Sequence, residues 1–179
     1  MKTHKTAVVA IPPGDIWEPI QAIRRRLDRN IRRWMPHITM VYPFRPLHEF
    51  EDLSRKFEEI CASFPPFRIR LVEFRYFQHS KGSYTVWLYP DPKEPIVELQ
   101  RALSRVVPDC DDVGKHRKGF APHLSVGQVR LEVGDVIRRL GETWESLEFI
   151  LDEIALISRN DPPDDVFETR VKVRLGRDL

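Results

Sequence analysis

The sequence predicts one domain that mixes α-helices and β-strands in two similar halves. Its 179 residues lie within the range of about 50 to 250 residues typical of single domains. Segments with apolar residues every three or four positions alternate with short apolar segments, as expected when helices alternate with strands. A proline–histidine pair that opens an apolar segment occurs twice, at residues 36–37 and 122–123, and suggests the two halves.

The first half is predicted to run strand, helix, strand, helix. Residues 5–11, KTAVVAI, form a short β-branched apolar run that a Pro-Pro-Gly turn ends, which is typical of a buried strand. Isoleucine and leucine recur at helical spacing over residues 15–30, with Asp15 at the N-cap position. A second strand is expected at residues 37–44, HITMVYPF, and a second amphipathic helix at residues 49–64, which two prolines close.

The remainder of the chain is predicted to form a hairpin and then the second half. Residues 67–77 alternate between apolar and polar side chains, and residues 83–90 follow a turn as their antiparallel partner. The elements expected after the hairpin are a helix at residues 94–107, a strand at 123–129, a helix at 133–142, and strands at 148–159 and 166–176.

Composition favours a cytoplasmic or nuclear protein over a secreted or membrane protein. Hydrophobic residues make up 41% and charged residues 31%, and no apolar run approaches the roughly 20 residues that a membrane span needs. The basic N-terminus with its short apolar patch is a poor signal peptide. Cys61 and Cys110 are far apart, so we expect packing residues rather than a disulfide framework or a zinc site.

The two proline–histidine pairs are each followed by a hydroxyl side chain. Alternate residues of a strand share one face, so His37 lies on the same face as Thr39, and His123 on the same face as Ser125. If these strands meet side by side or across a groove, two imidazoles and two hydroxyls surround one point. One imidazole can then accept a proton while the other donates one, which phosphodiester cleavage requires, and the hydroxyls can hold the phosphate oxygens.

A single such motif is weak support for a site. The segment from His4 to Thr6 matches the same pattern but lies at the terminus with a lysine in the middle. His48, His79 and His116 have no such strand setting, and an isolated histidine is more often a packed or surface residue. The repeat of the motif, each time after proline and within an apolar strand, is what favours a shared catalytic site. With no chelating carboxylates on the motif strands, no metal ion is expected.

The duplicated motif resembles that of the 2H phosphoesterase superfamily, which includes 2′-5′ RNA ligase-like proteins and RNA 2′,3′-cyclic phosphodiesterases. MVYPF after the first motif and GFAPHLSVGQ around the second resemble this branch. The resemblance covers nearly the whole chain. It implies an α+β fold of two interleaved, pseudo-symmetric lobes within one domain, residues 1–179, whose antiparallel-rich sheets form a central groove with helices outside. It also implies metal-independent action without a cofactor.

By this resemblance His37 and His123 are the acid–base pair, and Thr39 and Ser125 hold the phosphate. Serine replaces the threonine of many relatives and keeps the hydroxyl. The expected reaction is hydrolysis of a ribose 2′,3′-cyclic phosphate to a 2′-phosphate by a monomer, on RNA ends or small cyclic nucleotides. His123 is then the base and His37 the acid, or the reverse. Alternatives are 2′-5′ RNA ligation, a 2′-5′ phosphodiesterase or exoribonuclease, and a module that binds nucleotides or 2′-5′ oligonucleotides.

Aromatic and basic side chains near the motifs are candidates for substrate binding. Phe44 and Phe120 are able to stack on a nucleobase, with core packing as the alternative, whereas strand alternation predicts that Tyr42 faces away from the site. The cations on the loop before the second motif that we expect to contact substrate are Lys115, Arg117 and Lys118.

Two further groups of side chains have two interpretations each. The arginines of residues 24–33 either follow an RNA backbone or form the solvated side of a helix. These are Arg24, Arg25, Arg26, Arg29, Arg32 and Arg33. In the hairpin, Tyr76, Trp87 and Tyr89 either contact a base, as the resemblance suggests, or pack across the strands.

Overall fold

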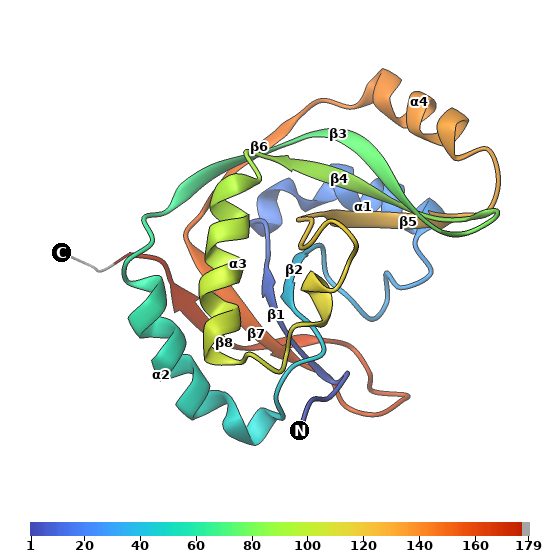
Figure 1. Ribbon diagram of the computed structural model, residues 1–179. Coiled ribbons are helices and arrows are strands. Elements are labelled where there is room, and N and C mark those ends of the chain that lie inside the picture. The colour runs from blue at the N-terminus through green and yellow to red at the C-terminus, as the bar shows by residue number, and fades with distance from the viewer. Residues whose placement is uncertain (177–179) are drawn as a thin grey trace.

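The computed structural model describes residues 1–176 (Figure 1). The helices are α1 (Trp17–Leu27), α2 (Phe50–Cys61), α3 (Glu94–Val106) and α4 (Val133–Thr143). The strands are β1 (Thr6–Ala10), β2 (Ile38–Val41), β3 (Phe67–Ser80), β4 (Ser83–Asp91), β5 (Leu124–Val129), β6 (Leu147–Leu151), β7 (Glu153–Ser158) and β8 (Glu168–Arg174). The predicted α+β class is confirmed.

All eight strands belong to one antiparallel sheet, in the order β6-β3-β4-β5-β2-β1-β7-β8. The two sheets expected from the sequence are joined at the centre, where β2 meets β5 through a single registered pair, Ile38 opposite Leu124. The helices cross between the halves. Helix α1 follows β1 but packs against β5, and α3 follows β4 but packs against β2.

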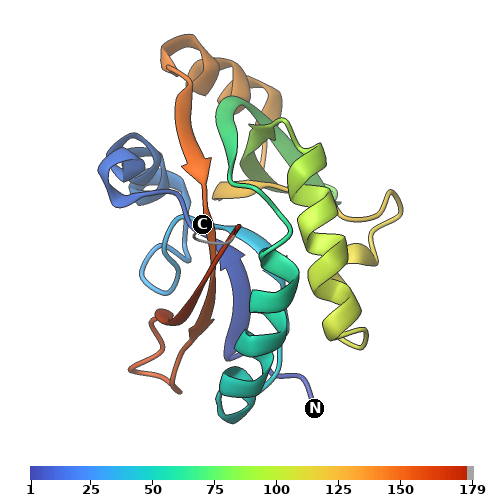
Figure 2. The ribbon, with the colours of Figure 1, turned by 90° about the vertical axis from the view of Figure 1, so that its left-hand side faces the viewer.

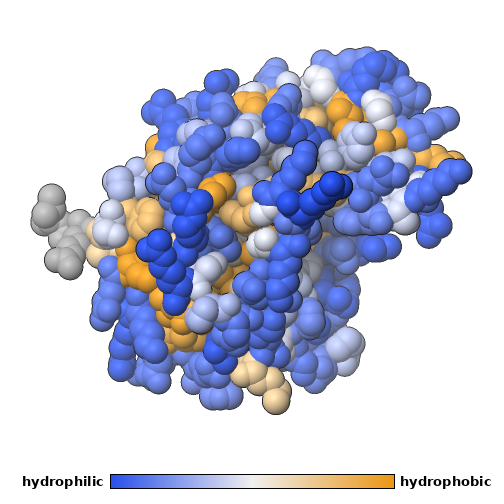
Figure 3. All heavy atoms as spheres, in the orientation of Figure 1, coloured by the Kyte–Doolittle hydropathy of each residue, from blue (hydrophilic) through white to orange (hydrophobic). Residues whose placement is uncertain are grey.

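The larger of two hydrophobic clusters lies beneath the helices. Every strand contributes to it, and so do all four helices, through side chains such as Ile20, Phe57, Leu103 and Val133. The smaller cluster consists of Ala7, Val9, Ala155, Ile157 and Phe167. Figure 2 shows α2 and α3 side by side, with α1 apart from them. In the space-filling view hydrophilic side chains cover most of the visible face (Figure 3). Both cysteines are fully buried in the larger cluster, which confirms the expectation that they are packing residues.

Close contact between α1 and β5 requires a glycine. A Cβ atom at Gly127 would lie 2.4 Å from the Leu27 Cβ atom and 2.8 Å from the Leu27 carbonyl carbon. These contacts are shorter than real Cβ atoms make, so only glycine allows the end of α1 to rest on the strand. The end of α1 is thereby brought beside β5, close to the second motif.

Two sequence predictions were wrong in detail. The first helix spans only Trp17–Leu27, because residues Gly14–Ile16 form a 3-10 turn, and Asp15 lies inside that turn instead of capping the helix. The strand predicted at 148–159 is divided at Asp152 into β6, which pairs with β3, and β7, which lies between β1 and β8. The apolar pattern is continuous because both parts face the same core. No helix of residues 1–176 has the length and apolarity to span a membrane.

Candidate active site

The same local contact holds both motif histidines. The Nδ1 atom of His37 lies 2.7 Å from the carbonyl oxygen of Met35, and that of His123 lies 2.7 Å from the carbonyl oxygen of Ala121. A carbonyl oxygen only accepts, so Nδ1 donates in both rings and Nε2 keeps a free lone pair when the ring is neutral. Met35 and Ala121 each precede a proline, which favours extended backbone there. The proline of each motif therefore helps to fix the tautomer of its histidine.

The register of β2 and β5 brings the four predicted catalytic residues together. Because Ile38 lies opposite Leu124 in an antiparallel pair, His37 lies opposite Ser125, and Thr39 opposite His123. Opposite residues on one face have Cβ atoms about 4.5–5.5 Å apart, and diagonal neighbours such as the two histidines about 7–8 Å. The side chains of His37, Ser125, His123 and Thr39 thus alternate between imidazole and hydroxyl around a local two-fold axis through the pair Ile38–Leu124.

A β-bulge follows each motif at the same distance. On β2 the partners of Val8 and Val9 are Val41 and Thr39, so Met40 is an extra residue. On β5 the partners of Val86 and Trp87 are Gly127 and Ser125, so Val126 is the equivalent extra residue. A bulge inserts one residue and reverses the alternation of side chains after it.

These bulges turn two side chains toward the motifs. Tyr42 and Gln128, each five residues after a motif histidine, line a hollow of about 240 Å³ that we call the His37 hollow. Its other lining residues include His37, Thr39 and Ser125. The prediction that Tyr42 faces away from the site was therefore wrong, because the alternation argument did not include the bulge.

The two imidazoles have different aromatic neighbours. The Trp34 ring stacks on His37, with centroids 4.6 Å apart and planes at 18°. The rings of Phe77 and Trp87 meet His123 edge to face, at 4.9 Å and 5.7 Å. Of the predicted hairpin residues Tyr76, Trp87 and Tyr89, it is Trp87 that contacts a motif histidine, and it pairs with Ser125. Phe77, in the same hairpin, was not among the candidates. Trp34 was missed, and its only signal in the sequence is its position three residues before the histidine.

Comparison with known proteins identifies the family of this chain. The family model described as the 2′-5′ RNA ligase superfamily matches residues 12–163. This chain belongs to the 2′-5′ RNA ligase superfamily. A protein of Geobacillus kaustophilus named Putative phosphoesterase GK0864 is 27% identical over 125 residues, which is 69% of each chain.

Two solved structures share the fold of this superfamily member. The crystal structure of TT0787 of Thermus thermophilus has a TM-score of 0.68 and 18% identity, and covers 99% of this chain and 100% of its own. The crystal structure of E. coli LigT complexed with 3′-AMP has a TM-score of 0.59 and 16% identity, and it also covers 99% of this chain and 100% of its own. At this identity the likeness describes the fold.

In this superfamily member a buried ion pair supports the His37 side of the site. The Nε atom of Arg24 donates to Asp28 at 2.8 Å, and its Nη2 atom donates to the Trp34 carbonyl oxygen at 2.8 Å. Asp28 also accepts from the Gln128 amide at 3.2 Å. Arg24 thus links the end of α1 to the residue that stacks on His37. Arg24 was expected either to follow an RNA backbone or to lie on the solvated side of the helix, and its burial contradicts both interpretations. Contacts across the fold have no local sequence signal.

Most of the arginine cluster is paired within the protein. Arg25 forms an exposed pair with Glu18. Arg32 and Arg33 both bind the buried Asp165, at 2.7 Å and 2.6 Å, and their hydrogen bonds lower the pKa of Asp165 to about 2. These contacts do not favour the interpretation that the whole cluster follows an RNA backbone.

The predicted substrate-binding side chains do not line the His37 hollow. Phe44 is fully buried in the core against Phe50 and Phe57, so it has no face for a base, and its prediction as a stacking residue was wrong. Phe120 and Lys115 line a separate hollow beside α3, where Lys115 pairs with Asp111. Arg117 and Lys118 are exposed on the loop before His123.

Burial lowers the pKa of both catalytic candidates. For His37 burial has the largest effect and the Arg24 cation adds to it, so that its pKa falls to about 4 despite the hydrogen bond to Met35. For His123 burial again dominates, and the nearby His116 lowers the pKa further. Burial therefore favours the neutral form of both rings.

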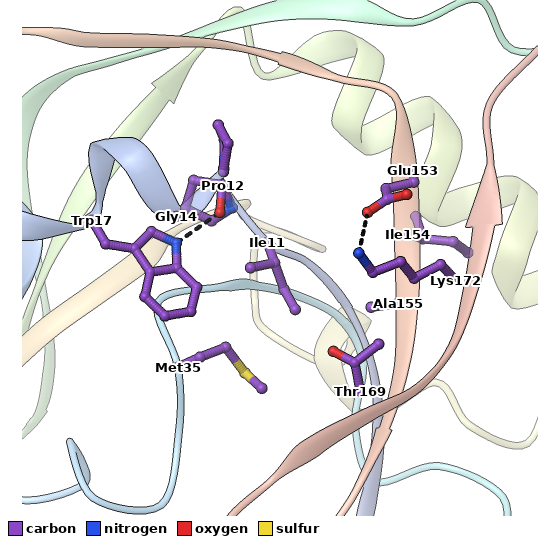
Figure 4. Close-up of a pocket in the computed structure, with 11 residues that line it drawn as sticks. Ile11, Pro12, Gly14, Trp17, Met35, Glu153, Ile154, Ala155, Thr169 and Lys172 are labelled. Carbon is purple, nitrogen blue, oxygen red and sulfur yellow. Dashed lines mark hydrogen bonds and ion pairs between the residues drawn. The ribbon is translucent and has the colours of Figure 1, made fainter.

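A further hollow of about 260 Å³ lies between the start of α1, the segment 11–14 after β1, and strands β7 and β8 (Figure 4). Its walls include Trp17, Met35 and the ion pair of Glu153 with Lys172, at 3.4 Å. Met35 separates it from the motif, since its carbonyl oxygen accepts from His37. We call this space the Trp17 hollow. In residues 1–176 no group of three His, Cys, Asp or Glu side chains is arranged to hold a metal ion.

Proposed function

We propose that this protein hydrolyses ribose 2′,3′-cyclic phosphates to 2′-phosphates by two-histidine acid–base catalysis without a metal ion. The observation that carries the proposal is the alternation of two imidazoles and two hydroxyls around the pair Ile38–Leu124. Each imidazole has its Nδ1 atom engaged by a backbone carbonyl. Each Nε2 atom is therefore the one available for proton transfer.

In the proposed reaction neutral His123 removes a proton from a water molecule, whose oxygen attacks phosphorus opposite O3′. The bond between phosphorus and O3′ breaks, and protonated His37 donates its proton to O3′, so the 2′-phosphate remains. Hydroxyl groups of Thr39 and Ser125 donate to the non-bridging oxygens as charge develops on them. After the step His123 is protonated and His37 neutral, and exchange with solvent restores the starting state. The near two-fold geometry also allows the reverse assignment, which the pKa of about 4 at His37 favours, because this ring is hard to protonate near neutral pH in the free protein.

The relatives support this choice of substrate. E. coli LigT, which shares the fold, has been crystallised with 3′-AMP and with phosphate. A ribonucleotide and an inorganic phosphate are the ligands expected for a site that binds a ribose phosphate. The superfamily name itself refers to RNA.

The direct test is product analysis with an oligonucleotide that ends in a 2′,3′-cyclic phosphate, in the presence of EDTA. We expect a 2′-phosphate and no 3′-phosphate. Absence of turnover together with tight binding would instead identify a binding module. Joining of the cyclic end to an added 5′-hydroxyl end would identify ligation as the main activity.

The lowered histidine pKa values predict an acidic optimum for kcat/KM. The productive free enzyme carries one proton on the pair, so kcat/KM is largest between the two pKa values of the pair. One of these is about 4, and the other lies below the usual value of about 6.5 for histidine. We expect kcat/KM to peak below pH 6.5 and to fall above it, in assays from pH 4 to 8.5. Because a bound phosphate anion raises both pKa values, the kcat profile is expected at higher pH. An optimum of kcat/KM above pH 7 would contradict this.

Removal of a phosphate-holding hydroxyl is expected to reduce kcat more than it raises KM. Loss of one donor to a developing negative charge typically costs about 10²–10³-fold in kcat. We expect losses of this size for Thr39→Ala and Ser125→Ala, measured by steady-state kinetics. The matched exchanges Thr39→Ser and Ser125→Thr keep a hydroxyl and should retain most of the activity. Equal activity of the alanine and hydroxyl variants would exclude the proposed role.

A further inference from the structure

We propose that a polar hollow at the tip of the β3–β4 hairpin binds the phosphates of the nucleotides upstream of the reacting end. The protein would then act on the ends of RNA chains in preference to single cyclic nucleotides. The inference rests on the proposed function, because it extends the same site. We call this space the hairpin hollow, and its volume is about 440 Å³.

The hairpin hollow adjoins the His37 hollow. Thr85 and Gln128 line both. Gln128 is fixed between them, because its amide accepts from the backbone N–H of Arg29 at 3.1 Å and donates to Asp28 at 3.2 Å. Thr85 is held on the other wall by a contact of 2.7 Å with His79. A chain that leaves the catalytic residues therefore has the hairpin hollow next to it, beside these two side chains.

The charge of the hairpin hollow suits a polyanion. Arg29, Lys81 and Arg130 line it, and no Asp or Glu is among its lining residues. Across residues 1–176 none of these three cations forms an ion pair, although Arg25, Arg32 and Arg33 of the same arginine-rich region do. Three unpaired cations around one hollow, in a chain whose net charge is only +2, indicate an electrostatic site for phosphate.

The size of the His37 hollow also calls for an additional subsite. Its volume of about 240 Å³ lies below the range of about 300–1,000 Å³ typical of complete small-molecule sites. It suits the reacting phosphate and ribose, while the rest of an oligonucleotide needs space beside it. The hairpin turn is well placed to provide that space, since Gly82, with φ of 76°, brings the tip against the Arg130 carbonyl oxygen.

Other hollows fit a phosphate chain less well. In the Trp17 hollow the one cation, Lys172, is neutralised by Glu153, and no lining residue is shared with the His37 hollow. In the hollow beside α3, Lys115 is paired with Asp111, and although Arg101 forms no ion pair within residues 1–176, that hollow shares no lining residue with the His37 hollow. Among these three spaces only the hairpin hollow combines unpaired cations with lining residues of the His37 hollow.

The test compares adenosine 2′,3′-cyclic phosphate with the tetranucleotide AAAA ending in the same group, which has three phosphates upstream of the reacting one. For the wild type we expect kcat/KM to be at least about tenfold higher for the tetranucleotide at low salt, with a log–log salt slope near −2 for three phosphate contacts. In the double variant Lys81→Gln/Arg130→Gln we expect the tetranucleotide-to-mononucleotide ratio to fall about tenfold, and the slope to weaken by about 1.4. The matched control is Lys56→Gln/Arg105→Gln, which removes two exposed cations from α2 and α3.

A second measurement does not depend on turnover. Fluorescence anisotropy of a labelled oligoadenylate ending in a 2′-phosphate should show weaker binding to Lys81→Gln/Arg130→Gln than to the wild type and the control. If neither substrate is hydrolysed, the proposed function fails and this binding result decides the inference alone. Equal use of both substrates by the wild type, or an equal ratio in the two double variants, would overturn the hairpin hollow as an RNA subsite.

Discussion

His37→Ala and His123→Ala are each expected to reduce hydrolysis of a cyclic-phosphate-ended oligonucleotide by about 10³-fold, within the range of 10²–10⁴ for loss of a general acid or base. The structure predicts effects of similar size, because both rings have the same Nδ1 contact and lie diagonally across one strand pair. The double variant should lose little more than either single variant, since the two groups act in the same step. Single-turnover assays with excess enzyme would measure this.

His48→Ala is the matched control, because His48 is exposed, lies in the 3-10 turn Leu47–Glu49 and belongs to neither motif. It should retain full activity. Circular dichroism and binding of a product-like 2′-phosphate should show that the motif variants remain folded. The substrate bis(p-nitrophenyl) phosphate would separate the roles of the two histidines, because its leaving group needs no proton. It should therefore restore activity only to the variant that lacks the general acid. Undiminished turnover by both single variants would exclude two-histidine catalysis.

Arg24→Met is expected to be the most destabilising of the arginine substitutions. The Arg24 and Asp28 side chains are only 2% and 4% exposed, and breaking such a pair from one side costs about 3–5 kcal/mol, because a buried charge is left alone. This is a large share of the roughly 5–15 kcal/mol typical of a whole domain, so urea denaturation should detect it readily. Asp28→Asn in the same chain should restore part of the stability by removing the unpaired carboxylate.

The adjacent residue provides the control for this prediction. Arg25 pairs with Glu18 at the surface, where ion pairs contribute little, so Arg25→Met should leave the urea midpoint unchanged. Arg24→Met should also raise the pKa of His37, because the Arg24 cation lowers it in the wild type. The kcat/KM profile measured at low temperature should then shift to higher pH. Equal stability of the two methionine variants would show that the buried pair does not anchor the site.

Much of this architecture was predictable because local patterns determine it. Helical spacing predicted the four helices, and strand alternation correctly placed His37 and Thr39 on one face and Ile38 on the other. The repeat of the motif in apolar strands predicted that the four candidate residues meet, and the pair Ile38–Leu124 shows how they do so.

The missing details depend on contacts between distant segments. The bulges at Met40 and Val126 reflect pairing with β1 and β4, and without them alternation misplaces Tyr42 and gives no role to Gln128. Arg24 differs from Arg25 only in what the folded chain places around it. A basic segment in the sequence therefore could not distinguish buried anchors from free surface cations.

The crossing of α1 onto β5 and of α3 onto β2 has a consequence for the ancestry and engineering of this scaffold. Helix α1 packs against β5, the motif strand of the second half, and α3 packs against β2, the motif strand of the first half. Two subunits exchange elements in this way in a domain-swapped dimer. If the polypeptide were divided between its two halves, β2 and β5 would each lose the helix that packs against them. Neither fragment is thus a self-sufficient half-enzyme, and activity from a divided gene requires that both fragments associate again.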